Sequence, residues 1–198
     1  MAEIDFYFDV YSPFAYLASH RIGEIADTYS QKINYFPIDL VKVKKAVGNT
    51  GPANTDIPLK LRYLLVDLKR WADRYGLPLE MPPRADCNRI NKGALFAKQY
   101  GRERSYIREA YAQVWGKGEN PDSNEVLSQV AKTMGWDPAE FLAFIASDAT
   151  EATYQKIFDH AINRGVFGVP YTIIGDEAWW GNDRLSFVEE ALSSEVPA

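Results

Sequence analysis

Ser12 places a hydroxyl group where a helix is predicted to begin, and that position is suited to binding an anion. Residues 4–8 form an apolar run typical of a buried strand, and residues 13–29 follow with helical periodicity. Pro13 suits the first helical position, because the N–H that proline lacks would have no helical partner there. The free N–H groups and the dipole of a helix start stabilise negative charge, so the Ser12 hydroxyl can assist an anion such as a thiolate.

The turn at residues 12–15 reads Ser-Pro-Phe-Ala, where thioredoxin-like folds carry a Cys-x-x-Cys motif between a strand and a helix. Because no cysteine is present here, the turn cannot cycle between dithiol and disulfide, and a bound thiol cofactor is indicated. Ser12-Pro13 taken alone favours a plain helix N-cap, for which serine is among the best residues. Val169-Pro170 favours the binding role, because it precedes a predicted strand where such folds carry a cis-proline facing the turn.

The composition is that of an ordinary globular protein: of 198 residues, 46% are hydrophobic and 25% are charged. The formal net charge of −5 argues against a nucleic-acid-binding surface. Cys87 is the only cysteine, and His20 and His160 lack ligand-like spacing, so neither a disulfide nor a metal site is expected. With no signal-peptide pattern and no long apolar run, we expect no membrane association and a cytoplasmic location.

The predicted elements form an α/β protein. Strands at 4–8 and 33–38 flank the helix at 13–29, and a polar loop follows at 48–54. The middle of the chain is predicted to be helical, with a helix ended by Gly76, a break near Gly101, helix starts at Asp122 and Asp137, and a helix at 150–164. The chain then returns to strands, with a hairpin formed by residues 171–174 and 178–180, and ends in a helix at 183–193.

This order predicts a thioredoxin-like fold split by an all-helical insertion domain. Residues 1–41 and 151–198 carry the strands and would form the thioredoxin-like domain. Residues 42–150, which are helical from about residue 58, would form the insertion domain that covers the substrate site.

Segments spread over nearly the whole chain resemble the 2-hydroxychromene-2-carboxylate isomerases. This family belongs with the kappa-class glutathione transferases, in the disulfide-oxidoreductase-like branch of thioredoxin folds. The resemblance is weakest over residues 83–88. The matching segments are Asp5 to Ala18, Asp39 to Pro52, Asp67 to Trp71, and Phe167 to Leu185.

The resemblance implies a glutathione-dependent cis–trans isomerase of naphthalene-type aromatic catabolism. Such an enzyme interconverts 2-hydroxychromene-2-carboxylate and trans-o-hydroxybenzylidenepyruvate, and it needs rotation about a double bond. Reversible addition of a thiolate makes that bond single for a moment, which is covalent catalysis with a borrowed nucleophile. The family suggests a homodimer.

The resemblance also implies roles for individual residues. Ser12 would be catalytic, with its hydroxyl donating to the glutathione sulfur, and Lys44 and Asn49 would bind the anionic substrate. Asp183 suits the γ-glutamyl ammonium, although Asn182 and Asp183 could also cap the last helix. The glutathione contacts implied are Ser12, Phe14, Lys44, Asn54, Val169, Pro170, Asn182 and Asp183.

Two alternatives to the isomerase stay open. A kappa-like glutathione transferase would release the thiol adduct as its product. A non-catalytic binding module of thioredoxin fold would have lost its redox cysteines without gaining a reaction. The continuous match through residues 180–184 favours the isomerase.

Overall fold

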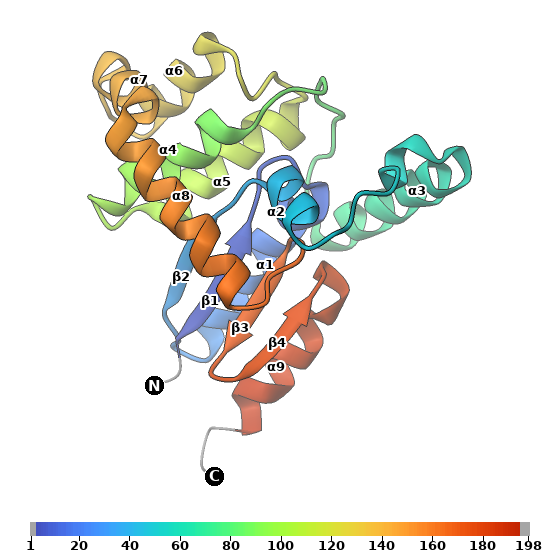
Figure 1. The fold of residues 1–198 in the computed structure, drawn as a ribbon. Helices are drawn as coiled ribbons and strands as arrows, with labels where there is room; N and C mark the ends of the chain where they lie inside the picture. Colours follow the sequence, from blue (N-terminus) through green and yellow to red (C-terminus); the bar gives the residue numbers. More distant parts are fainter. Residues whose placement is uncertain (1–2, 195–198) are drawn as a thin grey trace.

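The computed structural model describes residues 3–194 (Figure 1). Its sheet has the strand order β2-β1-β3-β4. β1 pairs parallel to β2 and antiparallel to β3, and β3 pairs antiparallel to β4. The mixed sheet confirms the predicted α/β class. The strands are β1 Ile4–Phe8, β2 Ile33–Pro37, β3 Tyr171–Ile174 and β4 Glu177–Trp180.

Helices cover both faces of this sheet. α1 (Pro13–Thr28) and α9 (Leu185–Ser194) lie on one face, and α2 (Leu40–Ala46) and α8 (Asp148–Asn163) lie on the other (Figure 1). Both faces of β1 are therefore buried, which explains its apolar sequence. A strand buried on both sides fixes the position of the turn that follows it, and that turn carries Ser12.

The elements formed by residues 54–146 are all helices joined by loops, as predicted. The elements are η1 Asn54–Asp56, α3 Pro58–Tyr75, α4 Asn88–Lys98, α5 Glu103–Tyr111, a π-helical turn at Ala112–Gly116, α6 Asn124–Thr133 and α7 Pro138–Ala146. Gly76 ends α3 in the left-handed conformation, with φ of 64°. The helical break near Gly101 is confirmed, because α4 ends and α5 begins on either side of it.

Two local expectations need correction. Residues 40–46 were not predicted to be helical, yet the Asp39 side chain accepts the Lys42 N–H and caps α2. The predicted helix start at Asp122 is one residue early, because the Ser123 hydroxyl is the N-cap and accepts the Val126 N–H. The start at Asp137 is confirmed, since its carboxylate accepts the Glu140 N–H.

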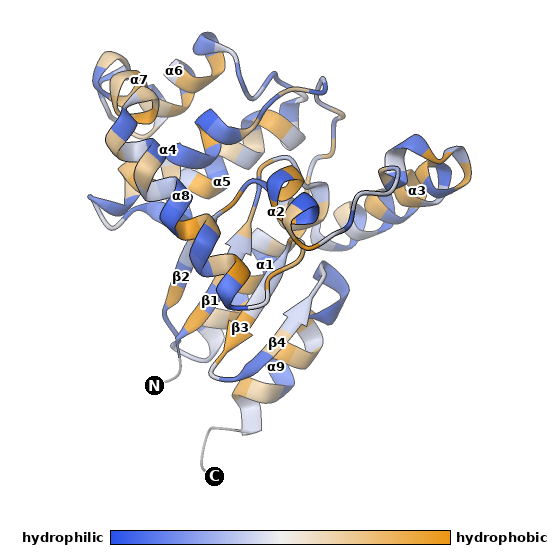
Figure 2. Cartoon of the chain, viewed as in Figure 1, coloured by the Kyte–Doolittle hydropathy of each residue, from blue (hydrophilic) through white to orange (hydrophobic). Residues whose placement is uncertain are grey.

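The helix α3 extends away from the sheet (Figure 1), and hydrophobic residues recur along it (Figure 2). Within residues 3–194, no helix combines the length and the apolarity needed to cross a bilayer. The division into residues 1–41 with 151–198 and residues 42–150 stays a prediction. Its outer ends, residues 1–2 and 195–198, lie outside the described residues.

Candidate functional site

Ser12 is the N-cap of α1, and its side chain is 6% exposed. Its Oγ accepts the Ala15 N–H at 3.3 Å, which leaves the hydroxyl hydrogen available to a second partner. Pro13 has no N–H, and the Phe14 N–H belongs to the donors that a helix start leaves without a helical acceptor. The hydroxyl, the free N–H and the helix dipole together favour an anion at this turn.

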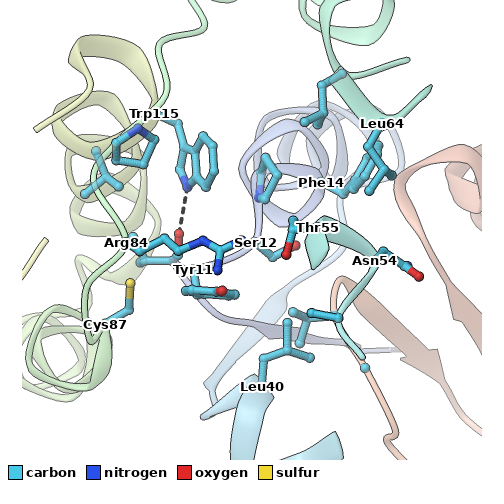
Figure 3. Close-up of a pocket in the computed structure, with 18 of the residues that line it drawn as sticks. Tyr11, Ser12, Phe14, Leu40, Asn54, Thr55, Leu64, Arg84, Cys87 and Trp115 are labelled. Carbon is cyan, nitrogen blue, oxygen red and sulfur yellow. Dashed lines mark hydrogen bonds between the residues drawn. The ribbon is translucent and has the colours of Figure 1, made fainter. Parts of the chain in front are cut away.

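Ser12 lines a cavity of about 360 Å³ (Figure 3). Its walls come from the start of α1, α2, the loop into η1, α3, the loop before α4, and the segment before β3. Much of the lining is apolar, including Leu61, Leu64 and Leu68 of α3, which form one stripe of that helix. The cavity can therefore hold a hydrophobic ligand beside the Ser12 hydroxyl.

The structure brings six of the predicted site residues to this one cavity, from segments far apart in the chain. They are Ser12, Phe14, Lys44, Asn49, Asn54 and Val169. Pro170 follows Val169 through a cis peptide bond, and its carbonyl accepts the Gly181 N–H at 2.9 Å.

Gly168 allows the segment before β3 to pack closely against β4. A Cβ atom there would lie 2.8 Å from Nε1 of Trp180, so an alanine would displace the indole ring. Trp180 also packs edge-to-face on Phe167, with ring centroids 5.0 Å apart. Both aromatic residues line the cavity and form its wall beside Val169.

Asn182 and Asp183 line a second cavity rather than the first. This cavity lies between α1, α3 and the start of α9, and its lining includes Arg74 and Tyr75. Asn182 is buried, and neither its amide oxygen nor its amide nitrogen makes a hydrogen bond of normal geometry, although the Tyr75 hydroxyl lies near the amide. The capping interpretation is wrong for these residues, because Gly181 is the N-cap of η3 (Asn182–Arg184) and no side chain caps it.

The loop before α4 supplies cavity residues that sequence reasoning missed. Arg84 extends toward the cavity (Figure 3), and its Nη2 lies 3.4 Å from an oxygen of Asp56. Arg84 lies in residues 83–88, the weakest part of the family resemblance, and these residues show no periodicity. No local pattern in the sequence could therefore have placed it here.

Cys87 also lines this cavity, with its thiol drawn toward the interior in Figure 3. Burial, followed by the nearby Asp9 carboxyl, raises the pKa of the thiol far above its ordinary value. Cys87 therefore stays protonated and cannot replace an absent active-site thiolate. Among the described residues, no group of three or more His, Cys, Asp or Glu side chains is arranged to hold a metal ion.

Asp9 is a second polar residue that the sequence did not single out. It follows β1, is buried at 3% exposure, and accepts hydrogen bonds from Tyr11 N, Leu40 N and Asn91 Nδ2. Burial raises the pKa of this carboxyl from 3.8 to about 6, although the hydrogen bonds from Asn91, Leu40 and Tyr11 oppose the shift.

Comparison with known proteins adds evidence from nearly the whole chain. Residues 3–193 match the model of the DSBA-like thioredoxin domain. The chain belongs to the DSBA-like thioredoxin family. A 2-hydroxychromene-2-carboxylate isomerase of Pseudomonas sp. (strain C18) is 44% identical over 96% of this chain and 89% of its own length. A solved structure of a 2-hydroxychromene-2-carboxylate isomerase superposes with a TM-score of 0.93 at 43% identity, covering 96% of this chain and 94% of that one.

A more distant relative is glutathione S-transferase kappa 1 of Caenorhabditis elegans, 26% identical over 100% of this chain and 93% of its own length. The predicted thioredoxin-like fold and the resemblance to an isomerase family with kappa-class relatives are thereby confirmed.

Proposed function

We propose that this protein is a glutathione-dependent isomerase that interconverts 2-hydroxychromene-2-carboxylate and trans-o-hydroxybenzylidenepyruvate in the catabolism of naphthalene-type aromatics. The observation that carries the proposal is the Ser12 hydroxyl at the start of α1, facing an apolar cavity without a cysteine thiolate. The names of relatives up to 44% identical support the reaction. A kappa-class relative with glutathione in its name supports the cofactor.

The residues present fit glutathione. Near Ser12, a helix start offers donors to a sulfur anion. Farther along, the buried Asn182 amide makes no hydrogen bond of normal geometry, and such a group calls for a polar ligand or a water molecule. Asp183 adjoins it with a carboxylate for an ammonium group, paired with Arg184 in this structure, and Val169 lines the first cavity beside Ser12. An extended peptide with a thiol in its middle matches this order of groups.

When bound, glutathione would supply a thiolate that adds reversibly to the conjugated double bond of the substrate. Ser12 would donate its O–H to the sulfur and hold the thiol in its ionised form. The Phe14 N–H and the dipole of α1 would act in the same direction. The reaction leaves no net change in atoms, so no residue of the chain is asked to transfer a group permanently.

The apolar wall and the cationic side chains would divide the recognition of the substrate. Leucines of α3, together with Trp115 and Met81, would hold the aromatic ring and exclude water. Lys44 would bind the carboxylate, with Asn49 beside it as an orienting group. We add Arg84 to this set, because its guanidinium matches a carboxylate in geometry and extends into the same cavity.

A kappa-like glutathione transferase is the second candidate, and the 26% identical relative favours it specifically. The two enzymes differ in the fate of the thiol adduct, which an isomerase retains until it reverts and a transferase releases. Mixing the protein with an electrophile such as 1-chloro-2,4-dinitrobenzene distinguishes them, because only a transferase accumulates the conjugate. A binding module would bind glutathione without catalysing either reaction.

We also propose that the protein is a homodimer and acts where glutathione is kept reduced, as in the cytoplasm. One face of α3 supports the dimer. Leu59, Tyr63 and Val66 recur at helical spacing on this face and are 75%, 63% and 47% exposed. The leucines on the neighbouring face of α3 line the cavity. The helix is therefore apolar both on the face toward the cavity and on this exposed face.

The deciding experiment follows the ultraviolet spectrum of a chromene carboxylate mixed with the protein. Dialysed protein should be nearly inactive, added glutathione should restore turnover, and a chelator should leave the restored rate unchanged. S-methylglutathione is the matched control, since it occupies the same site without an ionisable thiol. Full turnover in the absence of any thiol would contradict the proposal.

A further inference from the structure

The carboxylate of Asp9 connects three segments that form the cavity. Its Oδ1 accepts the Tyr11 N–H at 2.9 Å and the Asn91 Nδ2–H at 2.7 Å. Its Oδ2 accepts the Leu40 N–H at 2.8 Å. Tyr11 adjoins Ser12, Leu40 begins α2, and Asn91 lies in the first turn of α4.

Each of these segments contributes directly to the cavity lining. The turn contributes Tyr11 and Ser12, α2 contributes Leu40 and Lys44, and the residue before α4 is Cys87. The backbone of Asp9 adds to the same network, because its carbonyl accepts the Ser12 N–H and the Tyr111 hydroxyl, each at 2.9 Å. One buried residue thus sets the spacing between the Ser12 hydroxyl and the helix that carries Lys44.

The network needs a group that only accepts hydrogen bonds. An asparagine at position 9 would turn an NH₂ group toward one of the three donors, leaving two donors facing each other in a buried site. The three groups that donate hydrogen bonds to the Asp9 carboxylate are all uncharged. The ionisable groups that face this carboxylate are not cations either: they are Asp39 before α2, Cys87 before α4, Tyr111 of α5 and Tyr154 of α8. The ionised carboxylate is therefore held by hydrogen bonds alone.

We propose that Asp9 is a positioning residue, whose carboxylate keeps the Ser12 turn and α2 in register so that Ser12 and Lys44 face the same ligand. The proposal rests on the function proposed above for the cavity. Asp9 touches neither substrate nor cofactor, and it acts through the backbone of Tyr11 and Leu40. Its contribution belongs to the rate of the bound complex more than to the affinity for glutathione.

The test is the Asp9→Asn variant of the full-length protein. We expect kcat to fall roughly tenfold to a hundredfold, the change that follows from losing one hydrogen bond to a charged group. The Kd for glutathione should change far less. Asp5→Asn is the matched control, because Asp5 lies on β1 and does not line the cavity. Its carboxylate accepts from the Asn34 side chain at 3.0 Å and lies 4.0 Å from Nη2 of Arg164. Wild-type kcat in Asp9→Asn would overturn the proposal.

The pH profile separates positioning from general destabilisation. Because the pKa of Asp9 is about 6, protonation removes an acceptor as the pH falls through that value. Wild-type kcat should therefore decline below about pH 6, and this decline should be absent from the residual activity of Asp9→Asn. A variant that keeps the same acid limb as wild type would assign the limb to another group and overturn the proposal.

Amide signals report on the same network without any ligand. In wild-type protein, the proton shifts of the Tyr11 and Leu40 amides should titrate together with a midpoint near pH 6. This measurement stands even if the protein shows no isomerase activity, and it needs no folded variant. Amides that do not titrate, or that titrate with different midpoints, would overturn the proposal.

Discussion

The Ser12 hydroxyl combines a structural contact with a chemical one. Its oxygen accepts the Ala15 N–H as the cap of α1, and its hydrogen remains free to point into the cavity. The two contacts use different atoms of one side chain, so neither excludes the other. A substitution at this residue removes both, and a matched cap elsewhere in the chain is needed to separate them.

We predict that Ser12→Ala lowers kcat by about 10²- to 10³-fold, as expected for one donor to a developing anion. Loss of the cap should cost only about 1 kcal/mol of unfolding free energy. Ser123→Ala is the control, because Ser123 caps α6 through Val126 N at 3.1 Å and is not among the residues that line the cavity. Measuring kcat and the melting temperature of both variants separates the chemical role of Ser12 from its capping role. Equal stability losses with unchanged rates would leave Ser12 as a cap alone.

At the scale of the element, the two ends of the proposed cofactor site lie in different cavities. Val169 and Ser12 line the first cavity, whereas Asn182 and Asp183 of η3 line the second. Gly181, which has φ of 112°, connects the end of β4 to η3. The γ-glutamyl end of glutathione would therefore bind remote from the sulfur, and the two ends can be tested separately.

We predict that Asp183→Asn weakens glutathione binding by roughly 1.5–3 kcal/mol, the range for a hydrogen bond to a charged group. Saturating glutathione should restore most of the rate, because the carboxylate lies far from the reacting sulfur. Calorimetry and saturation kinetics measure the two effects. Asp176→Asn in the β3–β4 turn is the control. An unchanged Kd with a collapsed saturated rate would contradict the placement of the cofactor.

Elements with strong local signals could be predicted, and those that depend on distant partners could not. The start of α7 at the N-cap Asp137 and the end of α3 at Gly76 follow from the residues next to these positions alone. α2 was missed, because seven residues are too few for a clear periodicity. Arg84 and Asp9 were missed for a different reason: their contacts come from segments many residues away, which single-chain patterns do not reveal.

At the scale of the whole molecule, the site needs both the sheet and the helical segment. The sheet end and α1 supply Ser12 and Val169, and residues 40–87 supply Lys44, the leucine stripe and Arg84. Much of this second wall comes from α3, which extends from the body of the protein (Figure 1). A helix exposed in this way is stabilised when its outer apolar face is covered. We propose that a second copy of the chain covers this face of α3.

We predict that replacing Leu59 and Tyr63 together with lysine converts a dimer into a monomer, measured by light scattering across a range of protein concentrations. Burial of two large side chains contributes several kcal/mol to association at about 1.5–3 kcal/mol each, and two lysines add repulsion between the copies. Phe187→Lys is the control, because Phe187 is also half-exposed but lies on α9. Loss of the dimer only in the control would move the interface to α9. A wild-type protein that stays monomeric at every concentration would contradict the homodimer. The single chain would then have to hold α3, and with it the leucines that line the cavity, in place.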